Sequence, residues 1–129
     1  MPASSDPVLG LLLLAGTHER AHYAFVLATG AAATGREVVL FATNRGCHAL
    51  LADWSGLEAA SRDATIRARG VAGLTELREA AAALRVRLIV CEAGLRSEAL
   101  EDRAIMPGVE VAGVITFLSA VGTGQIVAL

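Results

Sequence analysis

The chain contains no lysine, since all 11 of its basic residues are arginines. This absence excludes Schiff-base chemistry on lysine and the phosphate-binding loops that depend on a lysine. Aromatic residues make up only 4% of the chain, too few for platforms on which nucleic-acid bases stack. Basic and acidic residues nearly balance, with a net charge of −2. The composition therefore predicts no binding to nucleic acid or to an anionic membrane.

Cysteines are few and long hydrophobic runs are missing. Two cysteines, Cys47 and Cys91, do not make a disulfide framework. The apolar run over residues 8–15 follows Asp6 rather than basic residues, unlike a secretory signal, and no run reaches the roughly 18 apolar residues of a membrane-spanning helix. Glycine-rich phosphate loops are missing as well. We therefore expect a cytoplasmic protein with reduced thiols, no membrane association and no cofactor.

Apolar residues, in contrast, are abundant. They make up 54% of the chain, which has 26 alanines, 18 leucines and a mean hydropathy of +0.55. A chain of 129 residues forms a single domain and buries only about two-thirds of its unfolded surface. The remaining apolar surface is most readily covered in a subunit interface, so we expect a homo-oligomer.

Short apolar runs alternate with longer stretches of helical periodicity. Residues 1–7 are expected to form a flexible tail, which leaves 8–129 as one domain. Strands are predicted at 8–14, 37–42, 86–90, 109–111 and 125–128. Helices are predicted at 18–34, 44–54, 75–84, 97–105 and 113–121, with 55–70 as an exposed excursion. This alternation predicts an α/β domain with a five-stranded parallel sheet and helices on both faces.

The carboxyl ends of the strands are where a doubly wound sheet places its ligand site. The candidate loops are 16–19, 43–48, 91–97 and 112–113. Cys91 is the strongest candidate because it ends a buried strand ahead of a helix, where backbone N–H groups favour a thiolate. The alternative is a thiol that only packs, since free cysteines are often buried.

The residues after Cys91 fit a loop that binds anions. Residues 91–97 read C-x-x-G-x-R-S. Gly94 permits a tight turn with inward N–H groups, and Arg96 can bind an oxyanion such as thiosulfate or sulfite. Locally the segment resembles the persulfide-carrying loop of rhodanese sulfurtransferases.

Other polar residues lie beyond the first two strands. Asn44, Arg45 and His18 are expected to line the mouth of the Cys91 site. His18 and His22 have the i, i+4 spacing of metal ligands, but no third ligand accompanies them. We expect both histidines on a solvated helix face and predict no metal site.

Cys47 lies beside His48 near the start of a predicted helix. Adjacent helix residues point about 100° apart, so the two side chains do not face each other as nucleophile and base. Core packing is therefore predicted for Cys47. A disulfide with Cys91 is not expected if one strand separates theirs, because the strand ends would then lie about 9–10 Å apart, beyond the roughly 7 Å that a disulfide spans.

Four segments, taken in order, resemble the DsrE/DsrF-like family of small sulfur-relay domains, which includes YchN-type proteins. These segments are residues 11–35, 37–43 (EVVLFAT), 87–91 (RLIVC) and 107–114 (PGVEVAGV). The resemblance implies a flavodoxin-like three-layer sandwich that assembles into trimers or hexamers. It also implies that Cys91 accepts sulfane sulfur as a persulfide and passes it on.

The leading hypothesis is a cytoplasmic sulfur carrier, or sulfurtransferase-like protein, that works between sulfur-donor and sulfur-acceptor proteins. Cys91 would hold the sulfur, N–H groups near Gly94 would stabilise the thiolate, and Arg96 would orient anionic donors. Two alternatives stay open. One is a non-catalytic oligomeric binding or regulatory module, and the other is a thiol redox protein that uses Cys91 and Cys47.

Overall fold

The computed structural model describes residues 6–129 and contains one sheet of five parallel strands. The sheet order is β4-β3-β2-β1-β5. The strands are β1 (Leu9–Leu13), β2 (Val38–Ala42), β3 (Arg87–Cys91), β4 (Glu110–Ala112) and β5 (Gln125–Ala128). The predicted α/β architecture with a parallel sheet is confirmed. Most of the predicted tail, residues 1–5, lies outside the described residues.

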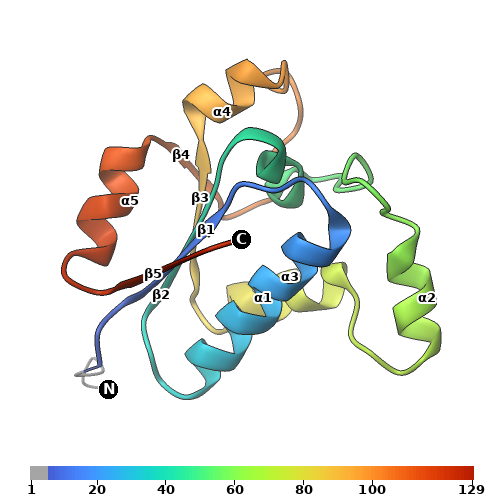
Figure 1. Cartoon of the computed structure of the whole chain (residues 1–129), viewed down its shortest axis with the longest axis horizontal. Helices are drawn as coiled ribbons and strands as arrows, with labels where there is room; N and C mark the ends of the chain where they lie inside the picture. The colour runs from blue at the N-terminus through green and yellow to red at the C-terminus, as the bar shows by residue number, and fades with distance from the viewer. Residues whose placement is uncertain (1–5) are drawn as a thin grey trace.

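The helices lie on both sides of the sheet (Figure 1). In that view α5 lies on one side, and α1 and α3 lie on the other. The helices are α1 (His18–Ala33), η1 (Asn44–Leu50, a 3₁₀ helix), α2 (Arg62–Ala68), α3 (Leu74–Ala83), α4 (Glu92–Ser97) and α5 (Val114–Val121). Helix α1 begins where expected, because the Thr17 hydroxyl accepts a hydrogen bond from the Arg20 N–H.

The strands at the centre of the sheet are apolar because helices cover them on both faces. All five residues of β2 are buried, and β3 is buried from Leu88 to Cys91. The two edge strands, β4 and β5, are much more exposed. Parallel register places Cys91 opposite Ala112, so the candidate cysteine ends β3 beside the edge strand β4.

The two faces of the sheet carry cores of different size. The larger core contains α1 and α3, whereas the smaller one lies under α5. In the smaller core the rings of Phe41 and Phe117 stack with centroids 5.0 Å apart. Cys91 belongs to this smaller core and Cys47 to the larger one. Strands β2 and β3 pair directly, so no strand lies between the segments that carry the two cysteines, and the expectation of an intervening strand is wrong.

The helix predicted at 97–105 is wrong. The helix of this region starts directly at Glu92 and ends at Ser97. It ends there because Ala99 adopts a left-handed conformation, φ 55°, while the Leu100 N–H donates to the Leu95 carbonyl at 2.8 Å. Leu95 and Leu100 are both buried, and such a closing pair is typical of a helix C-terminus.

Two other predictions are corrected in part. The excursion expected over 55–70 contains helix α2, which is anchored by the buried Asp63. The helix predicted at 44–54 is a 3₁₀ helix that ends at Leu50, after which Leu51 adopts an extended conformation.

Candidate functional site

Cys91 ends β3 and is also the N-cap residue of α4. Its Sγ atom accepts a hydrogen bond from the Gly94 N–H at 3.3 Å. This amide belongs to the first turn of the helix, where N–H groups lack partners within the helix. The Cys91 sulfur therefore takes the position that a serine or aspartate oxygen occupies in an ordinary helix cap.

Cys91 is buried among apolar side chains. Its cluster includes Val39, Phe41, Ile89 and Phe117. The residue retains 7% of its exposure, whereas Cys47 has none. Cys91 thus lies at the margin of the smaller core, with one amide hydrogen directed at its sulfur.

Gly94 is required by the close packing of α4 on η1. A Cβ at this position would lie 2.6 Å from the Asn44 backbone nitrogen, 2.8 Å from Thr43 Oγ1 and 3.1 Å from Cys47 Sγ. Contacts below 3 Å are not tolerated, so only glycine fits here without movement. Two predicted site residues, Gly94 and Asn44, are therefore brought together.

Arg96 forms an ion pair with a neighbouring residue on the helix surface. Its Nη2 atom lies 3.3 Å from Glu92 Oε1, and both side chains are about two-thirds exposed. This is an i, i+4 pair on the outer face of α4. The expected loop is a helix instead, so Arg96 pairs with Glu92 along α4.

The Cys47 thiol is deeply buried. Burial, followed by the nearby charge of Cys91, raises the pKa of the Cys47 thiol to about 12. The thiol donates weakly to the Ala42 carbonyl, with sulfur and oxygen 3.7 Å apart. Both cysteines are free thiols. Cys47 is therefore protonated at neutral pH and is a poor nucleophile.

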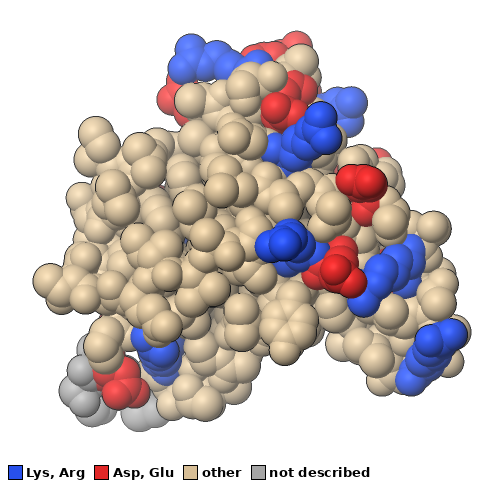
Figure 2. Space-filling view, in the orientation of Figure 1, with Lys and Arg blue, Asp and Glu red and all other residues tan. Residues whose placement is uncertain are grey.

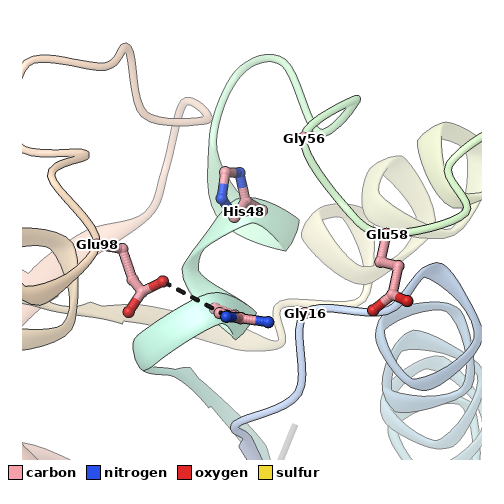
Figure 3. Close-up of a pocket in the computed structure, with 6 residues that line it drawn as sticks. Gly16, His48, Gly56, Glu58 and Glu98 are labelled. Atoms are coloured by element: carbon pink, nitrogen blue, oxygen red, sulfur yellow. Dashed lines mark ion pairs between the residues drawn. The ribbon is translucent and has the colours of Figure 1, made fainter.

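Arg45 lines a separate hollow at the carboxyl end of the sheet (Figure 3). This cavity of about 310 Å³ is lined by Gly16, Arg45, His48, Gly56, Glu58 and Glu98. The dashed line in Figure 3 marks the ion pair of Glu98 with Arg45 Nε, at 3.9 Å. His48 lies in the predicted loop 43–48, but Glu58 and Glu98 gave no sequence signal, because they come from segments far apart in the chain.

His18 does not lie on a solvated face, and this prediction is wrong. Its side chain is fully buried, with Nε2 2.7 Å from Asp63 Oδ1 and Nδ1 3.2 Å from Arg62 Nη1. Arginine only donates, so Nδ1 accepts and the Nε2 proton is directed at Asp63. His18 thus holds α2 against α1 and cannot line a solvent-facing mouth.

His22 is buried beside it for a related reason. Its Nε2 atom lies 2.8 Å from the Ala72 carbonyl oxygen, and its ring stacks on His18 with centroids 5.6 Å apart. Both histidines therefore fasten the segment 62–72 to α1. Neither spacing nor periodicity marks Asp63 or Arg62 as the partners of His18, because more than 40 residues separate them from it in sequence.

Comparison with known proteins identifies the family of this chain. The sequence matches the DsrE/DsrF-like family over residues 9–127. The chain belongs to the DsrE/DsrF-like family. Among curated protein sequences, none matches the chain significantly.

Two solved structures resemble this DsrE/DsrF-like chain over nearly its whole length. The YchN protein from E. coli has a TM-score of 0.71 at 13% identity and covers 96% of this chain and 99% of its own. A protein of unknown function from Methanobacterium thermoautotrophicum, MTH1491, has a TM-score of 0.61 at 16% identity, with 96% and 100% covered. These likenesses show the fold, and the family as a whole is linked to sulfur relay.

Two further observations concern this DsrE/DsrF-like domain. Over residues 6–129, no group of three or more histidine, cysteine or acidic side chains is arranged to hold a metal ion. Within the same residues, none of the helices combines the length and apolar character needed to cross a bilayer.

Proposed function

We propose that this protein is a small sulfur carrier that holds sulfane sulfur as a persulfide on Cys91. The observation that carries the proposal is the placement of the Cys91 sulfur. It ends a buried strand, retains some exposure and accepts the Gly94 N–H at 3.3 Å. An amide directed at the sulfur of a cysteine stabilises its thiolate.

Sulfur transfer at Cys91 needs no oxidant or reductant. The Cys91 thiolate attacks the outer sulfur of a donor persulfide, R–S–SH, and the donor S–S bond breaks. The donor leaves as the thiolate R–S⁻, and the enzyme holds Cys–S–SH. An acceptor thiolate then attacks the outer sulfur and releases Cys91 as its thiolate. With thiosulfate the same step releases sulfite.

The neighbouring residues have more limited roles. Gly94 supplies the N–H and lets α4 lie close against Asn44 on η1. Arg96 would orient an anionic donor only by exchanging its contact with Glu92, which is exposed and therefore weak. The donor would be a protein that presents a persulfide at this end of the sheet, and the acceptor would be a protein that presents a thiol there. Two free thiols favour a reducing location, so we place the protein in the cytoplasm.

Intact-mass analysis after incubation with a persulfide donor tests the proposal. The wild-type protein is expected to gain the mass of one sulfur atom, about 32 Da, which a reducing agent removes. Cys91→Ser is expected to gain nothing. Cys47→Ser is the matched control and is expected to gain the sulfur as the wild type does, because the Cys47 thiol is protonated and fully buried.

The alternatives give different results in the same experiment. Equal loading of Cys91→Ser would refute the carrier role. No loading at all, with slow alkylation of Cys91, would favour a binding module in which the thiol only packs. Loss of two free thiols on mild oxidation, with a disulfide formed, would favour a redox protein in which Cys91 and Cys47 act together.

We also propose that the protein forms a homo-oligomer, a trimer or hexamer, through the outer surface of β4 and α5. In Figure 2 the surface in the region of α5 is uncharged. The exposed apolar residues there are Val111, Val114, Ile115 and Leu118. Large exposed apolar patches mark interaction sites. Cys91 pairs with Ala112 of β4, so this interface would border the candidate site.

Ile115→Arg is expected to dissociate the oligomer to monomers in sedimentation-velocity experiments. Ile115 is 77% exposed in the single chain, so the substitution removes no core contact and the fold is expected to survive. A buried arginine without a partner in the interface would be strongly unfavourable. Tyr23→Arg, on the exposed side of α1, is the control and should leave the assembly unchanged. Wild-type protein that sediments as a monomer would contradict this proposal.

A further inference from the structure

The cavity of about 310 Å³ beside η1 is not used by the sulfur carrier proposed above. Its lining comes from Gly16 after β1, Arg45 and His48 on η1, and more distant residues Gly56, Glu58 and Glu98. The cavity therefore opens beyond the carboxyl ends of β1 and β2, which is where doubly wound sheets bind ligands. Its volume is at the lower end of ligand sites, so it suits a small molecule.

The cavity wall carries charged groups of both signs, and these groups do not satisfy one another's hydrogen-bonding capacity. Arg45 Nε lies 3.9 Å from Glu98 Oε1, beyond hydrogen-bonding distance, and the arginine side chain is 78% exposed. Glu58 forms no ion pair with any residue from 6 to 129. In Figure 3 the carboxylates of Glu58 and Glu98 lie on opposite sides of the hollow. A guanidinium and a carboxylate thus keep free hydrogen-bonding capacity.

His48 gives a second, independent indication. Its Nδ1 atom is buried and has no hydrogen-bond partner among the described residues. The ring packs so closely on Gly56 that any side chain at position 56 would overlap it. Buried polar atoms are nearly always paired in native proteins, so this nitrogen marks a place in the cavity wall where the chain alone leaves a polar atom unsatisfied.

We propose that this cavity binds a small zwitterion with one ammonium and one carboxylate, of the size of an amino acid or a dipeptide. The ligand carboxylate would lie on the Arg45 guanidinium, which suits two parallel hydrogen bonds. The ammonium would lie on Glu58. A purely anionic ligand would meet the two glutamates, whereas a purely cationic ligand would leave Arg45 unpaired. This binding is independent of Cys91 and goes beyond the carrier function.

Calorimetric titration with three matched probes tests the proposal. L-Alanyl-L-alanine carries both charges, its N-acetyl form lacks the ammonium, and its C-terminal amide lacks the carboxylate. We expect the free dipeptide to bind about tenfold more tightly than either derivative, the usual effect of one charge-assisted hydrogen bond.

Two variants test which residue binds each charged group of the ligand. Arg45→Gln is expected to remove the preference for the dipeptide over its amide, and Glu58→Gln the preference over its N-acetyl form. Arg20→Gln and Glu79→Gln, both exposed on other helices, are the controls and should bind as the wild type does. Cys91→Ser should also bind normally, which separates this result from failure of the carrier proposal. No saturable binding, equal affinity for all three probes, or equal weakening by the control variants would overturn the inference.

Discussion

Replacing Asp63 by alanine is expected to lower the free energy of unfolding by about 3–4 kcal/mol. The carboxylate of Asp63 is almost fully buried and lies 2.7 Å from His18 Nε2. The same oxygen accepts the Leu74 N–H at 2.8 Å, at the start of α3. Its removal leaves two buried donors without a partner, and separates α2 from both α1 and α3. Thermal unfolding should show a midpoint about 10 °C lower.

Asp102→Ala is the matched control for this loss. Asp102 is exposed, so its removal should change the midpoint very little. If Asp63→Ala were as stable as this control, the buried contact between Asp63 and His18 would not be what fastens α2 to the domain.

The dependence of stability on pH in the acid range gives a further prediction for Asp63. Burial acts to raise the pKa of its carboxyl, but hydrogen bonds from His18 and Leu74, with the charge of Arg67, outweigh burial and hold the pKa below its ordinary value. Because the folded-state pKa is lowered, its stabilising contribution is full above the unfolded pKa of about 3.9 and is lost as pH falls below it. Asp63→Asn should therefore be less stable than wild type at pH 7, and the difference should shrink below about pH 4. A constant difference from pH 7 to pH 3 would contradict this assignment.

The sheet could be predicted from the sequence because its pattern is local. Runs such as 37–42 and 86–90 are continuously apolar, and a strand covered on both faces produces such a run. The same reasoning placed Cys91 at the carboxyl end of a buried strand, and the structure has it there.

Two features of the candidate site could not be predicted, because they depend on contacts between distant segments. His18 and His22 have no local reason to be buried, since their partners lie on α2 and just before α3. The sequence predicts a loop around Arg96, but Arg96 lies in α4. The end of this helix depends on a contact between Leu95 and Leu100 around a left-handed Ala99. Alanine seldom adopts a left-handed conformation, so an alanine at position 99 does not indicate the end of a helix.

Gly94→Ala is expected to destabilise the protein by about 2–3 kcal/mol, although helix propensity alone favours alanine by about 1 kcal/mol. The new methyl group would lie 2.6 Å from the Asn44 backbone nitrogen and 2.8 Å from Thr43 Oγ1. A backbone atom cannot move aside as a flexible side chain does, so α4 must shift away from η1. That shift would also draw the Gly94 N–H away from the Cys91 sulfur.

Gly30→Ala is the control that separates packing from propensity. Gly30 also lies within a helix, but apart from the neighbouring backbone of that helix no atom lies within 4 Å of the position its Cβ would take. This substitution should stabilise the protein by up to about 1 kcal/mol in urea unfolding, opposite in sign to Gly94→Ala. Persulfide loading of Cys91 at a temperature where both variants are folded completes the comparison, with slower loading expected for Gly94→Ala alone. Equal loading by the two variants would mean that the Gly94 N–H does not support the reactivity of Cys91.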